Sequence, residues 1–240
     1  MDITIIIAII AAFIVKGMSG FANTLVFTSI MSFSANNINI TPVELLVGYP
    51  SNLYIAWKER KGISFRVCAP IAVFVIRGTI PGVLFLMKGD TSLLKTVFGF
   101  IVILFAIEML LRERQKNSKK SSKPVLLAIG ILSGILCGMF GVGAFLVAYI
   151  SRTTDNQMQF RSNLCFVFLM ENTFRILLYT LIGILNFTIV KRAVLLLPFM
   201  VIGLALGIFL SKKVNEKIAK NTVIILLIIS GISLIINNIR

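Results

Sequence analysis

The chain has 240 residues, of which 58% are hydrophobic and only 14% are charged, and its mean hydropathy is +0.97. Because a soluble domain carries about a quarter charged residues, this composition excludes a soluble globular protein and indicates an integral membrane protein. The net charge of +15 would suit a nucleic-acid-binding protein, but the Lys and Arg residues stand mostly in short connections between apolar runs, where membrane topology places them. We therefore expect the lipid bilayer, and no nucleic acid, as a partner.

Eight apolar runs follow one another along the chain, most of them near the roughly 20 residues that cross a bilayer. The first and the fifth are longer and are interrupted by glycine. The short run 43–57 is expected to extend into its flanks. Together the runs predict an all-α, polytopic membrane protein. In chain order they are residues 3–33 (broken near 17–23), 43–57, 66–87, 93–111, 125–150 (broken near 138–143), 162–182, 193–210 and 222–239.

The two interrupted runs are near copies of each other. At an offset of 121 residues, Gly17-x-x-Gly20 aligns with Gly138-x-x-Gly141. At an offset of 125, Gly78-x-x-x-Gly82 aligns with Gly203-x-x-x-Gly207, and such small-residue pairs predict close helix packing. The sequence therefore predicts two homologous helical repeats, each opening with a glycine-broken or re-entrant helix. Their bounds are residues 1–111 and 125–240, with a basic linker at 112–124.

The topology depends on whether the interrupted runs cross the bilayer. If both cross, each half has an even number of crossings and the halves are parallel. If each folds back as a re-entrant hairpin, the number is odd and the halves are inverted. The inverted arrangement gathers more Lys and Arg on one face, so the positive-inside rule favours it and makes the linker 112–124 cytoplasmic. Re-entrant half-helices meeting near the midplane would form one site between the repeats.

Most charged residues flank the apolar runs or stand near their ends, and four stand well inside them: Lys16, Arg77, Glu171 and Arg175. A charge at the bilayer centre costs about 2.5 kcal/mol or more and is expected to face a partner or a cavity. Arg77 is predicted either to bind or gate an anion or to form a structural ion pair. Glu171 and Arg175 share a helix face; they either neutralise each other, or Arg175 binds an anion and Glu171 takes up a proton. Lys16 either reaches a ligand at the first break or is solvated there.

The breaks supply further candidates for binding an anion. The half-helix after each break begins with unpaired N–H groups, which bind anions together with the helix dipole. No carboxylate lies in either broken segment, so no cation site is expected there. Asn52 and Asn172, in the helix after each broken segment, are either ligands or interhelical hydrogen-bonding groups. The candidates at the breaks are Gly17, Ser19, Gly20, Asn23 and Thr24 in the first, polar tip, and Gly138, Gly141 and Gly143 in the second, apolar tip.

Residue types with metal or catalytic chemistry are scarce. The chain contains no His, the commonest metal ligand and general base. Cys68, Cys137 and Cys165 are far apart, in or near apolar runs, and are interpreted as small buried hydrophobic residues. We therefore expect no enzyme, no metal and no other cofactor.

The duplicated broken segment resembles the TauE/SafE family of prokaryotic permeases, also called the sulfite exporter family. The resemblance covers the whole chain and rests on Gly17–Asn23, Gly138–Ala144, Gly62–Arg66 and Leu93–Gly99. It implies a permease of the prokaryotic plasma membrane for small anions, often sulfur-containing ones such as sulfite, thiosulfate or organosulfonates. The family's runs of two or three glycines are reduced here to Gly-Phe-Ala-Asn and Gly-Val-Gly-Ala, which is a departure from its pattern.

Three hypotheses compete. The leading one is a secondary anion permease that works by alternating access between the repeats, with Glu171 as the candidate for proton coupling. A passive anion channel would use the same basic residues, and saturable exchange would distinguish a carrier from it. A membrane scaffold or assembly protein predicts instead that Arg77→Ala impairs folding and that no anion binds. Each of these is compatible with a homodimer.

Overall fold

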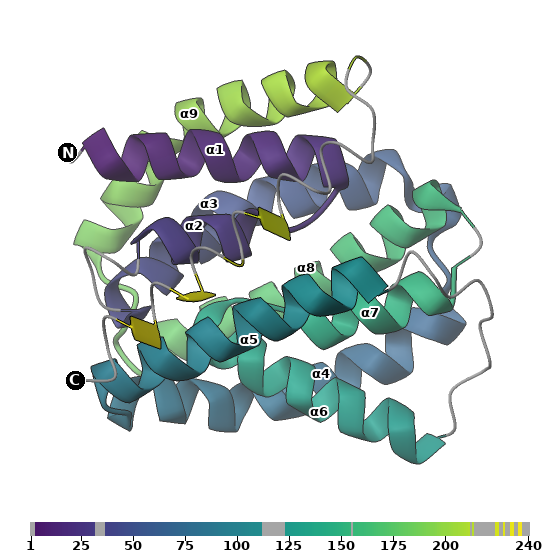
Figure 1. Cartoon of the computed structure of the whole chain (residues 1–240), viewed down its shortest axis with the longest axis horizontal. Helices are drawn as coiled ribbons and strands as arrows, with labels where there is room; N and C mark the ends of the chain where they lie inside the picture. The colour runs from purple at the N-terminus through teal and green to yellow at the C-terminus, as the bar shows by residue number, and fades with distance from the viewer. Residues whose placement is uncertain are drawn as a thin grey trace. The chain divides into compact units, whose positions relative to one another are not determined.

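In a computed structural model, the chain forms a set of helices joined by short connections (Figure 1). The structure describes residues 3–31, 37–111, 123–154, 156–211, 213, 224–225, 228, 231–232 and 235–236. No strand occurs among these residues, which confirms the all-α class. The helices are α1 (Ile3–Ser19), α2 (Asn23–Met31), α3 (Asn37–Lys58), the 3₁₀ turn η1 (Arg60–Gly62), α4 (Phe65–Lys88), α5 (Thr91–Leu111), α6 (Lys123–Phe140), α7 (Ala144–Arg152), α8 (Gln157–Leu181) and α9 (Phe187–Ser211).

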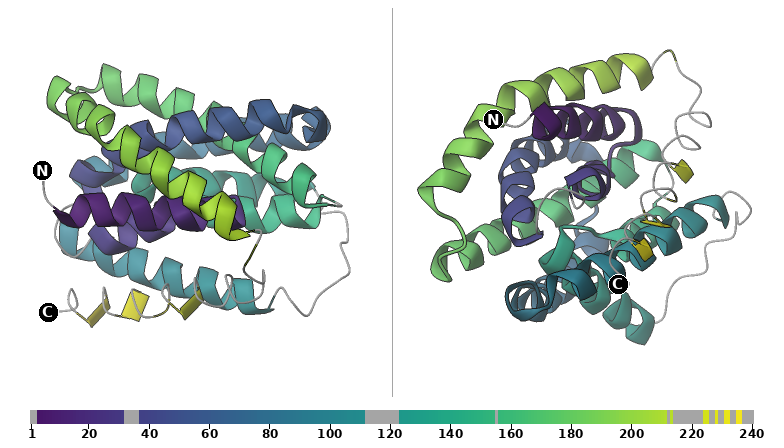
Figure 2. Two further views of the ribbon diagram at one scale, coloured as in Figure 1. Left: turned by 90° about the horizontal axis from the view of Figure 1, so that it is seen from above. Right: turned by 60° about the vertical axis from the view of Figure 1, so that its left-hand side comes forward.

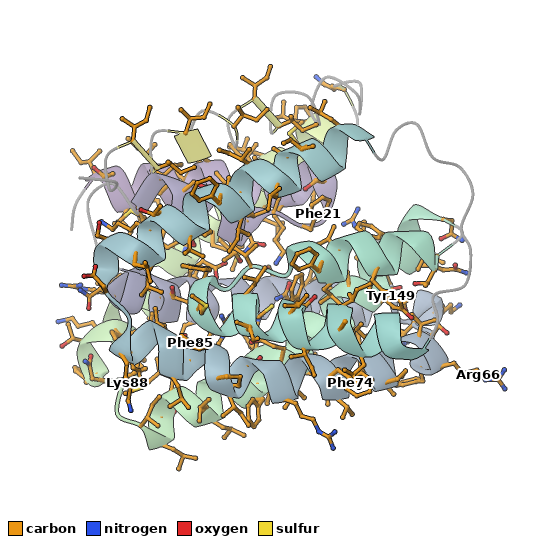
Figure 3. The ribbon with its side chains drawn as sticks, turned by 60° about the horizontal axis from the view of Figure 1, so that its bottom comes forward. Phe21, Arg66, Phe74, Phe85, Lys88 and Tyr149 are labelled. Atoms are coloured by element: carbon orange, nitrogen blue, oxygen red, sulfur yellow. The ribbon has the colours of Figure 1, made fainter. Side chains whose placement is uncertain are left out.

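The helices follow the predicted apolar runs. α3 begins at Asn37, so the short run 43–57 extends into its flank as expected. Among the described residues, three stretches are long and apolar enough to cross a membrane: Phe65–Lys88, Met158–Leu181 and Phe187–Ser211. The exposed basic side chains of Arg66 and Lys88 mark opposite ends of α4 (Figure 3), as suits a helix whose ends reach water. Run 222–239 and linker 112–124 lie mostly outside the described residues.

The chain divides into two compact units, and each unit contains parts of both halves of the sequence. Unit 1 comprises Met1–Val47, Gly89–Arg114 and Phe187–Arg240, and unit 2 comprises Gly48–Lys88 and Gln115–Asn186. The predicted repeats 1–111 and 125–240 are a division of the sequence, and that division stays a prediction. The compact units cut across it because each broken helix packs on a helix from the other half.

Unit 1 is organised around the pair α1 and α9, which lie side by side (Figures 1 and 2). Glycine makes this approach close: a Cβ on Gly17 would stand 2.7 Å from the Leu204 carbonyl oxygen, and one on Gly203 would stand 2.8 Å from that of Ile10. Small residues let helix backbones meet where lipid offers no hydrophobic driving force for helix association. Buried apolar side chains of α1, α2, the first half of α3 and α9 complete one cluster, including Phe13, Phe27, Val43 and Leu196.

In unit 2, α4 and α6 pack closely at glycines in the same way. A Cβ on Gly138 would stand 2.8 Å from the Val83 nitrogen, and one on Gly82 would stand 3.0 Å from the Gly138 Cα. The prediction that Gly78-x-x-x-Gly82 and Gly203-x-x-x-Gly207 serve helix packing is therefore confirmed. α8 packs against α4, α7 and η1 in the same unit.

Each broken segment folds back on itself. α2 packs along α1, and α7 packs along α6, with the chain reversing between the members of each pair (Figure 1). Positive φ angles mark the reversals, at Gly20 (84°), Ala22 (70°) and Gly141 (73°). This backbone is the one that the re-entrant alternative requires, while the orientation of the halves in a bilayer stays a prediction.

Candidate functional site

The first break brings together three buried or partly buried polar side chains. Asn23 and Thr24 are the first two residues of α2, and Glu44 lies on α3 in the same unit. The Asn23 side-chain amide donates to Glu44 Oε1 at 2.5 Å, and the Thr24 hydroxyl donates to the same oxygen at 2.8 Å. Glu44 is only 2% exposed. A carboxylate therefore already occupies the N-terminal end of this half-helix, where the donors and the helix dipole favour an anion.

Sequence reasoning missed Glu44. It stands at the edge of the run 43–57 and was therefore grouped with the flanking charges, although the helix in fact begins at Asn37. The length of that run could have revealed Glu44. The run is too short to cross a bilayer unless its flank is included, and including the flank places Glu44 inside the helix. The broken segments themselves contain no carboxylate, but α3 brings one to the first break in space.

Lys16 and Ser19 belong to the end of α1. Lys16 is 1% exposed, and its ammonium lies 5.8 Å from the centre of the Phe13 ring. A cation in the last turn of a helix also interacts favourably with the helix dipole. The Ser19 hydroxyl lies 2.8 Å from the Val15 carbonyl oxygen and 2.7 Å from that of Phe21, so it is engaged by the turn itself. Solvation of Lys16 at an exposed tip is excluded by its burial.

The candidate glycines have two different local roles. Gly17 and Gly138, which align in the repeat, both lie in close helix–helix contacts. Gly20 and Gly141, which also align, both take the left-handed conformation that ends the first half-helix. Gly143 has no positive φ; a Cβ there would stand 2.6 Å from the Phe168 ring. Packing and turn geometry thus account for these glycines without a ligand.

The side chain of Arg175, on α8, contacts the second break. Arg175 donates through Nη1 to the Cys137 carbonyl in the last turn of α6 and through Nη2 to Asn172 Oδ1 at 3.1 Å. Its Nε lies 3.4 Å from Glu171 Oε1, and both side chains are almost fully buried. The Tyr179 hydroxyl donates to the Gly138 carbonyl at 3.4 Å. Arg175 therefore caps the carbonyl end of a half-helix, where a positive charge is favourable.

Glu171 completes this second cluster. The Thr79 hydroxyl lies 3.3 Å from Glu171 Oε1 and 3.0 Å from the Val75 carbonyl oxygen. Glu171 Oε2 is buried and has no hydrogen-bond partner among the described residues. Glu171 and Arg175 thus form a buried ion pair, which is the mutual neutralisation that was one of the two alternatives for them.

Arg77 and Asn52, two further candidates, lie in unit 2. Arg77 is exposed, in the middle of α4, with exposed Val73 and Ile80 on the same helix face. No hydrogen bond or ion pair of Arg77 occurs within the described part of the chain, so the structure does not connect it to the second break of the same unit. Asn52 is buried on α3 within unit 2. Nor do the described residues contain a group of three His, Cys, Asp or Glu side chains that could bind a metal ion.

Comparison with known proteins identifies the family. No curated protein and no solved structure matches the chain significantly. A sequence model described as sulfite exporter TauE/SafE matches residues 5–234, in agreement with the resemblance noted from the broken segments. The match includes both breaks, both clusters and every helix described above except the first two residues of α1. The chain is thus an integral membrane protein of the transport type, and it belongs to the sulfite exporter TauE/SafE family.

Proposed function

We propose that this chain is a secondary permease of the prokaryotic plasma membrane that carries small sulfur-containing anions, such as sulfite, thiosulfate or organosulfonates, by alternating access between its two repeats. In this proposal the linker 112–124 faces the cytoplasm. Membership of the sulfite exporter family supports the transport of an anion. The reversal of both broken helices supports a carrier of the inverted-repeat type, because interrupted helices at membrane depth persist where they line a site.

One observation carries the anion assignment: the donors at the start of α2 already accommodate an oxyanion. Asn23 and Thr24 both donate to one carboxylate oxygen of Glu44. Sulfite and sulfonates present the same kind of acceptor, a negatively charged oxygen that takes several short hydrogen bonds. Lys16 supplies a buried positive charge in the same unit. A transported anion that replaces the Glu44 carboxylate would meet the same donors.

At the second break, the proposed role of Arg175 is indirect. Its donors are directed at Cys137, Asn172 and Glu171, so it orders the carbonyl end of α6. An anion would gain from Arg175 only by competing with Glu171. We therefore place the primary anion contacts at the first break and treat Gly138, Gly141, Gly143, Asn172 and Arg175 as groups that shape the second.

The test is ligand-dependent stability together with exchange in proteoliposomes. Purified protein is heated with sulfite, thiosulfate, taurine, a small sulfonate, sulfate or chloride. A ligand that binds only the folded state raises the melting temperature with concentration, by about 2.7 kcal/mol of stability at one hundred times its Kd. We expect one sulfur oxyanion to do so and labelled substrate to exchange against unlabelled substrate.

Thr24→Val tests the location of the site. It removes the donor while keeping the shape of the side chain, so the expected result is a clearly smaller shift in melting temperature. Thr180→Val is the matched control, because the exposed Thr180 hydroxyl donates to the Ile176 carbonyl of its own helix and to no other group among the described residues. Flux without saturable exchange would indicate a channel. If no anion shifts the melting temperature and none is exchanged, the scaffold hypothesis is correct instead.

A further inference from the structure

Among the described residues, Glu44 is the one buried carboxylate that bonds to the residues of the first break. Its donors Asn23 and Thr24 belong to the first turn of α2, which is the position that an anionic substrate would need. The side chain therefore acts as an internal anion. Among the side chains that the structure describes in unit 1, it is also the one buried acidic side chain.

A line of buried hydroxyls continues from this cluster. Thr28 follows Thr24 by one turn on α2, and Thr41 precedes Glu44 by one turn on α3, so each lies on the helix face that carries the Glu44 hydrogen bonds. Both are 0% exposed, and neither hydroxyl has a hydrogen-bond partner among the described residues. α2 and the first half of α3 run in opposite directions (Figure 1). Buried hydroxyls need a hydrogen-bonding partner, and a water, an ion or a polar ligand beside them would supply it.

Charge balance in unit 1 links Glu44 to the substrate. Lys16 is the one ionisable side chain of α1 and is buried, α2 has none, and Lys191 and Arg192 of α9 are exposed. With Glu44 ionised, the buried charges of Lys16 and Glu44 cancel. If Glu44 takes up a proton, the positive charge of Lys16 is left, and the Asn23 and Thr24 donors are no longer needed by a carboxylate. An incoming anion restores both the charge balance and the hydrogen bonds.

We infer that Glu44 is the carboxylate that couples anion binding to proton uptake: the ionised side chain occupies the anion position at the start of α2, and it leaves that position when it is protonated. This inference rests on the proposed function. Glu44 accepts one proton from the aqueous phase for each anion bound and returns it when the anion leaves. It takes the role that the sequence suggested for Glu171, whose carboxylate is held instead by Arg175.

The experiment measures sulfate binding as a function of pH on the full chain, by ligand-dependent melting and by the release or uptake of protons in weakly buffered detergent solution. Sulfate is used because its own charge stays constant over the range. In the wild type we expect binding to weaken roughly tenfold for each pH unit through the range where Glu44 loses its proton, with one proton taken up per anion bound. Glu44→Gln should bind sulfate equally well at all these pH values, without proton uptake.

Glu59→Gln is the matched control. It makes the same chemical change just beyond the end of α3, where Glu59 forms a partly exposed ion pair with Arg161 at 3.6 Å. It should keep the pH dependence of the wild type. A structural role for Glu44 would lower the stability of Glu44→Gln without flattening the pH profile.

Several outcomes would overturn the inference. One is a Glu44→Gln protein that binds sulfate with the wild-type pH dependence, and another is loss of that dependence in Glu171→Gln alone. If Glu44→Gln does not fold, the wild-type proton count decides, since binding without proton uptake is incompatible with the inference. If neither the wild type nor Glu44→Gln binds any anion of the panel at any pH, the proposed function itself has failed.

Discussion

Ala22 has a backbone conformation that is normally taken by glycine. It has a φ of 70°, in the left-handed region, within the turn that ends α1 and begins α2. A residue with a Cβ pays about 1–2 kcal/mol there, which glycine avoids. The first tip has fewer glycines than the family's pattern, yet its turn keeps the left-handed conformation. The consequence is that a residue with a Cβ bears the strain of that conformation.

We predict that Ala22→Gly raises the free energy of unfolding by about 1 kcal/mol, because relief of the strained φ exceeds the added freedom of the unfolded chain. Reversible unfolding in mixed detergent micelles would measure this. Ala12→Gly is the control: Ala12 is buried within α1, so the same change should lower stability by about 1 kcal/mol. A loss of stability in both variants would show that Ala22 contributes packing rather than strain.

A second prediction concerns Arg175 and Glu171, which are buried together. Arg175→Met leaves the Glu171 carboxylate without its cation and removes a donor from the Cys137 carbonyl. Breaking a buried pair in this way costs about 3–5 kcal/mol. The double variant Glu171→Gln/Arg175→Met should lose clearly less than the sum of the two single changes, because it leaves no unpaired charge. Strict additivity in this cycle would mean that the two side chains do not depend on each other.

At the scale of elements, the contact between α6 and α4 depends on the absence of a side chain at Gly138. An added Cβ would stand 2.8 Å from the Val83 nitrogen and 2.9 Å from the Gly82 carbonyl carbon, which are backbone atoms that cannot rotate away. Gly138→Ala should therefore separate the helices and lower the free energy of unfolding by about 2–3 kcal/mol. The aligned change Gly17→Ala should act similarly on α1 and α9, since its Cβ would stand 2.7 Å from the Ile208 nitrogen.

Gly183→Ala is the control for this prediction. It adds the same methyl group at a place where nothing lies within 4 Å, so only the φ of 75° opposes it, at a cost of about 1 kcal/mol. If Gly138→Ala were no worse than Gly183→Ala, the close approach of α6 and α4 would not be important for stability.

The elements could be predicted from the sequence, whereas their partners could not. Hydropathy located the helices, and glycine spacing located both breaks and the packing pairs, because these features are local. The contact between Asn23 and Glu44 joins residues on different helices, and the exposure of Arg77 depends on how α4 is rotated. Neither a contact between two helices nor the rotation of a helix can be deduced from a single apolar run. Candidate residues chosen by charge inside a run therefore included Arg77 and omitted Glu44.

At the scale of the whole molecule, the exchange of helices between the sequence halves is the main organising feature. α1 of the first half pairs with α9 of the second, and α6 of the second half pairs with α4 of the first. Each compact unit thus contains one broken helix and one glycine-lined partner. If the repeats move relative to each other during transport, each glycine contact must slide, because it joins a helix of one repeat to a helix of the other.

The outer surface of unit 2 yields the last prediction. Arg77 is exposed near the middle of α4, between exposed Val73, Ile80 and Leu84, on a helix long and apolar enough to cross a membrane. A charge at that depth, facing lipid, costs about 2.5 kcal/mol or more. We therefore predict that Arg77→Leu raises the thermal stability of the protein in lipid nanodiscs, whereas Ile80→Leu on the same face leaves it unchanged.

The opposite result would have a specific meaning. If Arg77→Leu lowers the melting temperature and also halves the mass of the particle measured by light scattering, Arg77 is paired across an interface between two copies of the chain. The expectation of a homodimer would then gain a defined contact, and the exposed face of α4 would be its location. Because the stabilisation predicted for a lipid-facing arginine has the opposite sign, the melting temperature and the mass together distinguish the two arrangements.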